Sequence, residues 1–412
     1  MKKFVITGTL CFLVCLSFGQ KKAISAADGN IKGNNPNIAE ARLLIKGALS
    51  NPETANNAEA WFVAGKIENK QLDKEKEKEI LSKTPNYEVM YGALGNFLPY
   101  FIKAAELDQL PDAKGKVKPR FLKDIRAITR VNRPYFINAG IYYYDNKDYE
   151  KAYNFFKTYS DIPKLSMYDD EKWNIAEGDT VELQVRYYTG LAASQISDHK
   201  AALEIFNDIK YKGLNETEIY KQLAFQYDQL GDSASYEQAI MEGILKFPDE
   251  DYFIKNIINI CIYSNKANEA IPYLEKAISQ NSNNAQLYDV LGQIFEADKK
   301  NDEAIINMKK ALSIEPENIE YLLHIGRVYF NLGVEKRGES DVVSDKDKSK
   351  ELLNQSLDSF KESMPYFEKI YELDPKNLPA ISALLSIYYS LRMPQYEKIE
   401  EIYNNLSNAD KE

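Results

Sequence analysis

Small and apolar residues return along this chain with a period of 34 residues. Within 285–318, two apolar-rich stretches flank the polar sequence EADKKND, which predicts two helices of about fourteen residues joined by a short turn. Pro316 cannot continue a helix, so it ends the second one. Five consecutive units on one period indicate a repeat protein built from helical hairpins. The position of Gly292 is held in the neighbouring units by Gly190, Ala224, Ile258 and Gly326.

The small residues have a packing role that follows from the size of the hairpin. A hairpin this short cannot bury its own apolar face, so it stacks on its neighbours. Gly292, Ala304 and Ala311 allow helix backbones to approach closely, and Tyr288 and Met308 fill the remaining space. The 412 residues include only 19 glycines and 15 prolines, which also favours an all-α protein.

At these positions the sequence resembles the tetratricopeptide repeat family, whose pattern is W-x2-L-G-x2-Y, then A-x3-F-x2-A, then P. The resemblance is strongest over 183–318. It implies a right-handed α-solenoid of about seven or eight stacked helix-turn-helix hairpins, with a concave groove for a protein or peptide partner. The family's places are filled by Tyr288, Leu291, Gly292, Phe295, Ala304, Met308, Ala311 and Pro316.

The array of repeats extends over 133–406 and contains two insertions. The first, near 165–180, reads LSMYDDEKWNIAEGDT and predicts a loop. The second, near 333–358, begins polar and ends as a helix, which delays the partner helix of that unit to MPYFEKIYELDP. Because insertions in repeat proteins gather on one face, the second is a candidate docking element. A degenerate last unit, 378–406, would cap the stack.

Residues 37–132 predict degenerate helices of the same type. Residues 38–50 form a leading half-unit, and Trp61, Ala64 and Gly65 begin a full unit. Its second helix is expected at FLPYFIKAAELDQL, after the charged spacer NKQLDKEKEKEILSK. Residues 20–36 are polar and contain glycine, which predicts a flexible tether.

Residues 1–19 predict a secretion signal of bacterial type. A basic start precedes an apolar run that is too short for a comfortable membrane span, and Ser17 and Gly19 occupy the places before the expected cut. Cleavage after Gly19 would give an exported protein, periplasmic or secreted; an uncleaved N-terminal anchor is the alternative. Lipid modification is disfavoured because bulky residues precede both cysteines of this segment. No later stretch is apolar enough to span a membrane.

Charge and chemistry argue against several classes of function. Without Lys2 and Lys3 the chain has 50 basic and 62 acidic residues, a net charge of −12, which disfavours nucleic acid and anionic lipid as partners. His199 and His324 lie in different repeats, and the sequence has no glycine-rich phosphate loop. Cys261 would be the one cysteine of the mature chain, so no internal disulfide is expected. We therefore expect no catalysis, no cofactor and no metal site.

Tyrosines supply the first candidate binding residues. The chain has 29 of them, and neighbours on a helix point about 100° apart, so not every ring in the runs 142–144, 187–188 and 388–389 belongs to the core. Tyr144, Tyr187 and Tyr389 are candidate ring surfaces for a peptide or a sugar. Ordinary packing between helices is the alternative.

The family resemblance supplies the second set. Some tetratricopeptide proteins hold the C-terminal carboxylate of a peptide with Lys and Asn one turn apart and a basic pair two units later. Asp289 and Leu323 depart from that pattern at the Lys position, which leaves either a partial carboxylate grip or a solvated helix face. The candidate groove residues are Lys255, Asn259, Gln293 and Arg327.

The sequence therefore predicts a non-catalytic scaffold of the bacterial cell envelope that binds a protein or peptide. The alternative is a glycan- or nutrient-binding helical-repeat protein associated with the outer membrane. Proteins of that class are usually lipid-anchored and rich in tryptophan at the sugar platform, whereas this chain has two tryptophans.

Overall fold

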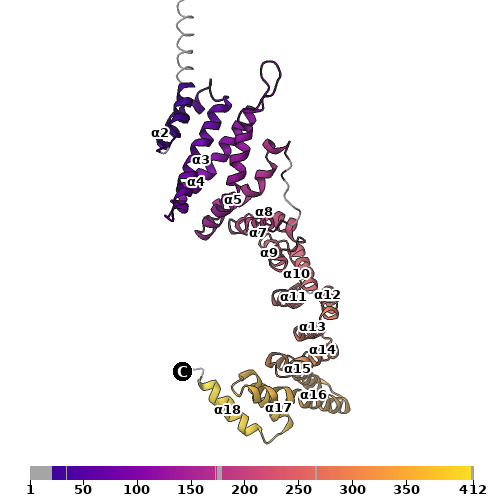
Figure 1. Cartoon of the computed structure of the whole chain (residues 1–412). Helices are drawn as coiled ribbons and strands as arrows, with labels where there is room; N and C mark the ends of the chain where they lie inside the picture. Colours follow the sequence, from indigo (N-terminus) through magenta and orange to yellow (C-terminus); the bar gives the residue numbers. More distant parts are fainter. Residues whose placement is uncertain (1–20, 34, 172, 174–178, 265–266, 410–412) are drawn as a thin grey trace, which may run out of the picture. The chain divides into compact units, whose positions relative to one another are not determined.

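The computed structural model describes residues 21–33, 35–171, 173, 179–264 and 267–409. The elements within these ranges are all helices, and no strand occurs among them (Figure 1). The chain divides into two compact units, Met1–Glu216 and Thr217–Glu412. The all-α hairpin fold predicted from the repeat is confirmed, while the predicted signal at 1–19 lies outside the described residues.

The first unit contains α2 followed by three helical hairpins, in each of which a glycine of the first helix faces a phenylalanine of the second. An added Cβ on these glycines would lie 2.4–2.7 Å from the nearest ring atom, so only glycine permits this spacing. The pairs are Gly65 with Phe101, Gly140 with Phe156 and Gly190 with Phe206. The helices are α2 (Ile38–Ser50), α3 (Ala58–Ile80), α4 (Tyr87–Asp108), α5 (Leu122–Asp145), α6 (Tyr149–Asp161), η1 (Ile162–Lys164), η2 (Ser166–Tyr168), α7 (Thr180–Gln195) and α8 (His199–Ile209), where η marks a 3-10 helix.

A helix at residues 21–30 stands where the sequence predicts a flexible tether at 20–36. Ile24, Ala27 and Ile31 are buried in the same apolar cluster as residues of α2 and α3. Lys66 of α3 donates a hydrogen bond to Asp28 at 2.5 Å. The tether prediction is wrong because apolar residues spaced by three and four form one helical face within an otherwise polar segment.

In the first full hairpin, the helices begin and end at residues other than those predicted. The charged stretch expected as a spacer continues α3 to Ile80, and α4 begins at Tyr87, well before the predicted start at Phe97. Lysine and glutamate favour helices, and this stretch also buries Leu72 and Glu75. A run of charged residues can therefore form a helix when one side of that helix packs against a neighbouring helix.

The predicted boundary between 132 and 133 falls inside α5. Asn132 is buried, donates to Asn69 Oδ1 at 2.8 Å and accepts from Lys76 Nζ at 3.0 Å. These bonds join α5 to α3, so the degenerate helices and the first regular repeats share one packed unit.

The second unit contains five hairpins, which brings the described total to eight, within the predicted number. In its third hairpin an added Cβ at Gly292 would lie 2.7 Å from Met308, as the small-residue pattern predicts. The helices are α9 (Glu216–Gln229), α10 (Ser233–Lys246), α11 (Asp251–Ser264), α12 (Ala267–Gln280), α13 (Ala285–Ala297), α14 (Asn301–Ile314), α15 (Ile319–Val342), α16 (Lys346–Leu373), α17 (Leu378–Leu391) and α18 (Tyr396–Ala409).

The insertion near 333–358 lengthens both helices of one hairpin. α15 and α16 have 24 and 28 residues, and the short connection 343–345 joins them. Ser356 Oγ donates to the carbonyl oxygen of Gly333 at 2.7 Å, and Phe360 packs on the same glycine. The polar stretch that begins the insertion is therefore the end of α15, held by the small-residue packing used elsewhere.

The insertion near 165–180 is a loop only in part. Its first residues form η2, in which Met167 and Tyr168 are buried, and the main chain of Met167 accepts a hydrogen bond from Arg126 of α5. Residues 174–178 lie outside the described part of the chain.

Candidate binding face

The first helices of the second unit present equivalent positions in a row. α11, α13 and α15 follow one another, and each contacts the next. Asn259, Gln293 and Arg327 lie 34 residues apart, so they occupy the same position on these three helices. Asn259 and Arg327 are exposed and Gln293 is half-buried. The structure thus brings three predicted groove residues to one face.

The two cations of the predicted site already have carboxylate partners within the chain. Lys255 Nζ lies 3.1 Å from Asp251 Oδ2, one turn earlier on α11. Arg327 forms a two-pronged pair with Glu296 of α13, with N···O distances of 2.7 and 3.3 Å. Ion pairs at a solvated surface contribute about 0–1 kcal/mol, so a ligand carboxylate can replace these partners at little cost. Contact between these residues and a ligand stays a prediction.

A buried polar link joins α13 to α15 behind this row. Asp289, which is 2 % exposed, accepts a hydrogen bond from Gln293 Nε2 at 2.8 Å. Nδ1 of buried His324 lies 2.9–3.0 Å from both Asp289 oxygens. In the sequence, Asp289 stands out only as a departure from a binding pattern. A spacing of 35 residues, one more than the repeat, was the available signal for this pair.

The two histidines belong to different units of the chain. His199 begins α8 in the first unit, whereas His324 lies on α15 in the second. Cys261 lies on α11, and its side chain is outside the described set. Within the described ranges, no group of three or more His, Cys, Asp or Glu side chains is placed to hold a metal ion.

Two of the candidate tyrosines take part in packing between helices. Tyr144 stands edge-on to Tyr149 and Tyr188, with ring centroids 5.2 and 6.4 Å apart, and its burial raises the pKa of its hydroxyl. Tyr187 lies 6.1 Å from the ring of Phe206 in its own hairpin. These contacts fit the packing alternative stated for both residues.

Tyr389 lies in different surroundings. Its side chain is 70 % exposed, and its ring centroid is 5.6 Å from that of Tyr396. Both rings line a surface hollow of about 390 Å³, together with Arg392 and Glu397. Of the three candidates, Tyr389 therefore offers the most accessible ring.

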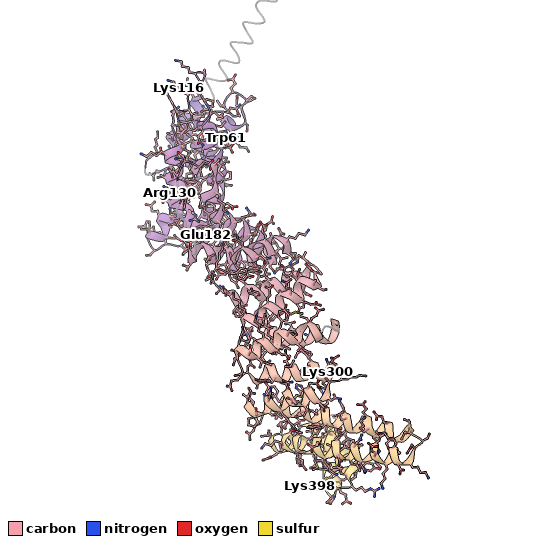
Figure 2. The ribbon with its side chains drawn as sticks, turned by 90° about the vertical axis from the view of Figure 1, so that its right-hand side faces the viewer. Trp61, Lys116, Arg130, Glu182, Lys300 and Lys398 are labelled. Carbon is pink, nitrogen blue, oxygen red and sulfur yellow. The ribbon has the colours of Figure 1, made fainter. Side chains whose placement is uncertain are left out.

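Both tryptophans are half-buried in the first unit, and Figure 2 labels Trp61 there. Trp61 Nε1 donates to the carbonyl oxygen of Ala55 at 2.7 Å. Trp173 stands edge-on to Tyr168, with centroids 4.8 Å apart, and the guanidinium of Arg130 lies 4.8 Å from its ring centroid. Both tryptophan side chains therefore take part in packing within the first unit.

Residues 285–318 match the family model described as Tetratricopeptide repeat. No curated protein sequence matches the chain. Among solved structures, MamA from residue 41 to its end, from Desulfovibrio magneticus RS-1, is 19% identical, with 49% of this chain and 99% of that chain covered and a TM-score of 0.32. A TPR repeats protein from Bacteroides fragilis is 18% identical, with 62% and 98% covered and a TM-score of 0.36. None of the described helices is long and apolar enough to cross a membrane.

Proposed function

Since this chain is a tetratricopeptide-repeat protein, we propose that it is a non-catalytic scaffold of the bacterial cell envelope that binds a protein or peptide. Repeats of this family are typically protein-interaction modules. The observation that supports the proposal most is the row Asn259, Gln293 and Arg327 on three successive first helices. The secretion signal predicted at 1–19 supports the envelope location.

The chemistry of the row suits a peptide. The amides of Asn259 and Gln293 can each donate and accept, which matches the main-chain groups of an extended ligand. Arg327 holds its carboxylate partner through two N–H groups, so a terminal carboxylate of a peptide can take the place of Glu296 with the same geometry. Binding of this kind requires little movement of the scaffold backbone.

A crosslinking pull-down with the chain 20–412 and envelope fractions of its own organism tests the proposal. Lys255→Glu reverses one charge beside the row, and Lys276→Glu makes the same change at an exposed lysine of the second helix α12. We expect the first variant to lose a partner that the wild type captures and the second to retain it. Equal capture by both variants would contradict binding along the first helices.

The hollow at Tyr389 supports glycan binding as a second candidate function. An exposed aromatic ring beside Arg392 and Glu397 combines a stacking surface with groups that bond hydroxyls. Calorimetric titration with envelope oligosaccharides would compare Tyr389→Ala with Tyr211→Ala, which removes another ring exposed to 66 %. Affinity lost only in the first variant would move this function to first place, and no binding by the wild type would eliminate it.

A further inference from the structure

A cavity of about 570 Å³ lies between α4 and α6, which are the second helices of two successive hairpins in the first unit. Phe136 of α5, the helix between them in the chain, also lines it. Ligand pockets of small molecules typically measure about 300–1,000 Å³, so this cavity has the size of a binding site. It lies in the other unit from the row of groove residues.

The lining of the cavity is mainly apolar. Leu98, Phe136 and Ile162 are themselves buried and form part of its wall. Gly95 of α4 keeps the space open, because it has no side chain and an added Cβ would already lie 3.4 Å from the ring of Phe155 across the gap. The wall therefore favours an apolar ligand body, since apolar surface removed from water stabilises the bound state.

One polar group of the wall is a main-chain carbonyl. Gly95 and Pro99 both line the cavity and are four residues apart on α4. In an α-helix the carbonyl oxygen of residue 95 accepts from the N–H of residue 99, but proline has no N–H. The Gly95 oxygen thus lacks the N–H donor of residue 99, and glycine contributes only main-chain atoms to the lining.

The charged side chains of the lining neutralise one another. Lys157 is paired with Asp161 one turn later on α6, and both line the cavity; Lys164, outside the lining, also contacts Asp161, at 3.3 Å. A charged ligand would leave its own charge against the apolar wall, which is unfavourable. The charges of the site therefore favour a neutral ligand.

We propose that this cavity binds a neutral, mainly apolar small molecule that carries one hydrogen-bond donor. The apolar body lies against the walls formed by α4, α5 and α6, and the donor bonds the carbonyl oxygen of Gly95. This site goes beyond the proposed function and does not depend on it.

Fluorescence titration of the chain 20–412 with N-phenyl-1-naphthylamine, a neutral aromatic molecule with a single N–H, tests the site. Gly95→Leu places a side chain in the cavity, and we expect it to weaken binding at least about tenfold. Gly92→Leu is the matched control on the same helix, because an added Cβ there meets nothing within 4 Å. Equal affinity in the wild type and Gly95→Leu, or equal loss in both variants, would overturn the proposal.

Pro99→Ala tests the hydrogen bond separately and avoids filling the cavity. Alanine supplies the missing N–H to Gly95, so the carbonyl no longer needs a ligand donor. Because Pro99 also lines the cavity, the two probes are compared: we expect binding of the naphthylamine to weaken about fivefold more than binding of 1-phenylnaphthalene, which has the same rings and no donor. Thermal melts of each variant show that it is folded, and an equal change for both probes would overturn the role of Gly95.

Discussion

Gly140 gives the sharpest test of how the hairpins pack. It lies on α5 opposite Phe156 of α6, and an added Cβ would lie 2.4 Å from two atoms of that fully buried ring. Contacts below 3.0 Å do not occur for real Cβ atoms, so the ring or the helix must move. Gly140→Ala therefore changes the spacing of the hairpin.

Two opposing effects set the size of the change. Alanine in a helix interior is favoured over glycine by about 1 kcal/mol. Overpacking a core costs about 1–3 kcal/mol, and a rigid ring at 2.4 Å places Gly140→Ala at the upper end of that range. We expect a net loss of about 2 kcal/mol, or about 4–8 °C in the melting temperature of a unit of this size. Gly92→Ala has the propensity gain without the clash, so it should stabilise by about 1 kcal/mol.

Differential scanning calorimetry of the wild type and both variants measures these shifts. Gly292→Ala extends the series, because its nearest neighbour is the flexible side chain of Met308, and we expect a smaller loss there. In a Phe156→Leu background, the further change Gly140→Ala should no longer destabilise and should approach the gain of about 1 kcal/mol expected at Gly92, since the ring that it meets is gone. Equal stability of Gly140→Ala and Gly92→Ala would refute this account of the packing.

Three further predictions concern stability. Asp289→Ala leaves two side chains without their acceptor, so urea unfolding should show a loss of about 2–3 kcal/mol, against less than about 0.5 kcal/mol for the exposed Asp251→Ala; equal losses would contradict the buried link. Lys147 has a φ of 63°, the left-handed region that favours glycine, so Lys147→Gly should raise stability by about 1 kcal/mol, and no gain in a thermal melt would count against strain there. Burial raises the pKa of Tyr91 to about 12 from its ordinary 10.0, so its contribution is complete below pH 10 and is lost as the pH rises through about 12. Thermal melts between pH 10 and about 12 should therefore show a smaller loss of stability for Tyr91→Phe than for the wild type, and the exposed Tyr389→Phe is the control. Equal losses of stability in Tyr91→Phe and the wild type would contradict the raised pKa.

The sequence predicted the repeat because its packing rules are local. Gly292 meets Met308 within one hairpin, so the period of 34 residues carries both partners of the contact. Residues 21–30 and the charged end of α3 were predicted as irregular, since their few apolar positions are separated by polar and charged residues. Those helices exist because α2, α3 and α4 supply the surfaces against which the few apolar residues are buried.

Candidate site residues could be placed on helices from the sequence, but their ion-pair partners and their exposure to solvent could not be predicted. Arg327 appeared as a cation available to a ligand, and Glu296, 31 residues earlier, turns out to be its partner. Tyr144 and Tyr389 have the same side chain, yet one lies among rings and the other is exposed to solvent. Whether each ring is buried or exposed depends on the helices that neighbour it.

The sequence by itself determined that this chain folds into helical hairpins, how long the repeat is, and which small residues permit close packing. Only the tertiary structure decided which charges are paired, which rings remain exposed, and that α4 and α6 leave a cavity beside Gly95. The physical reason is the range of each interaction. Contacts within a hairpin repeat with the sequence, whereas the Arg327–Glu296 pair and the cavity depend on distances between side chains of different hairpins.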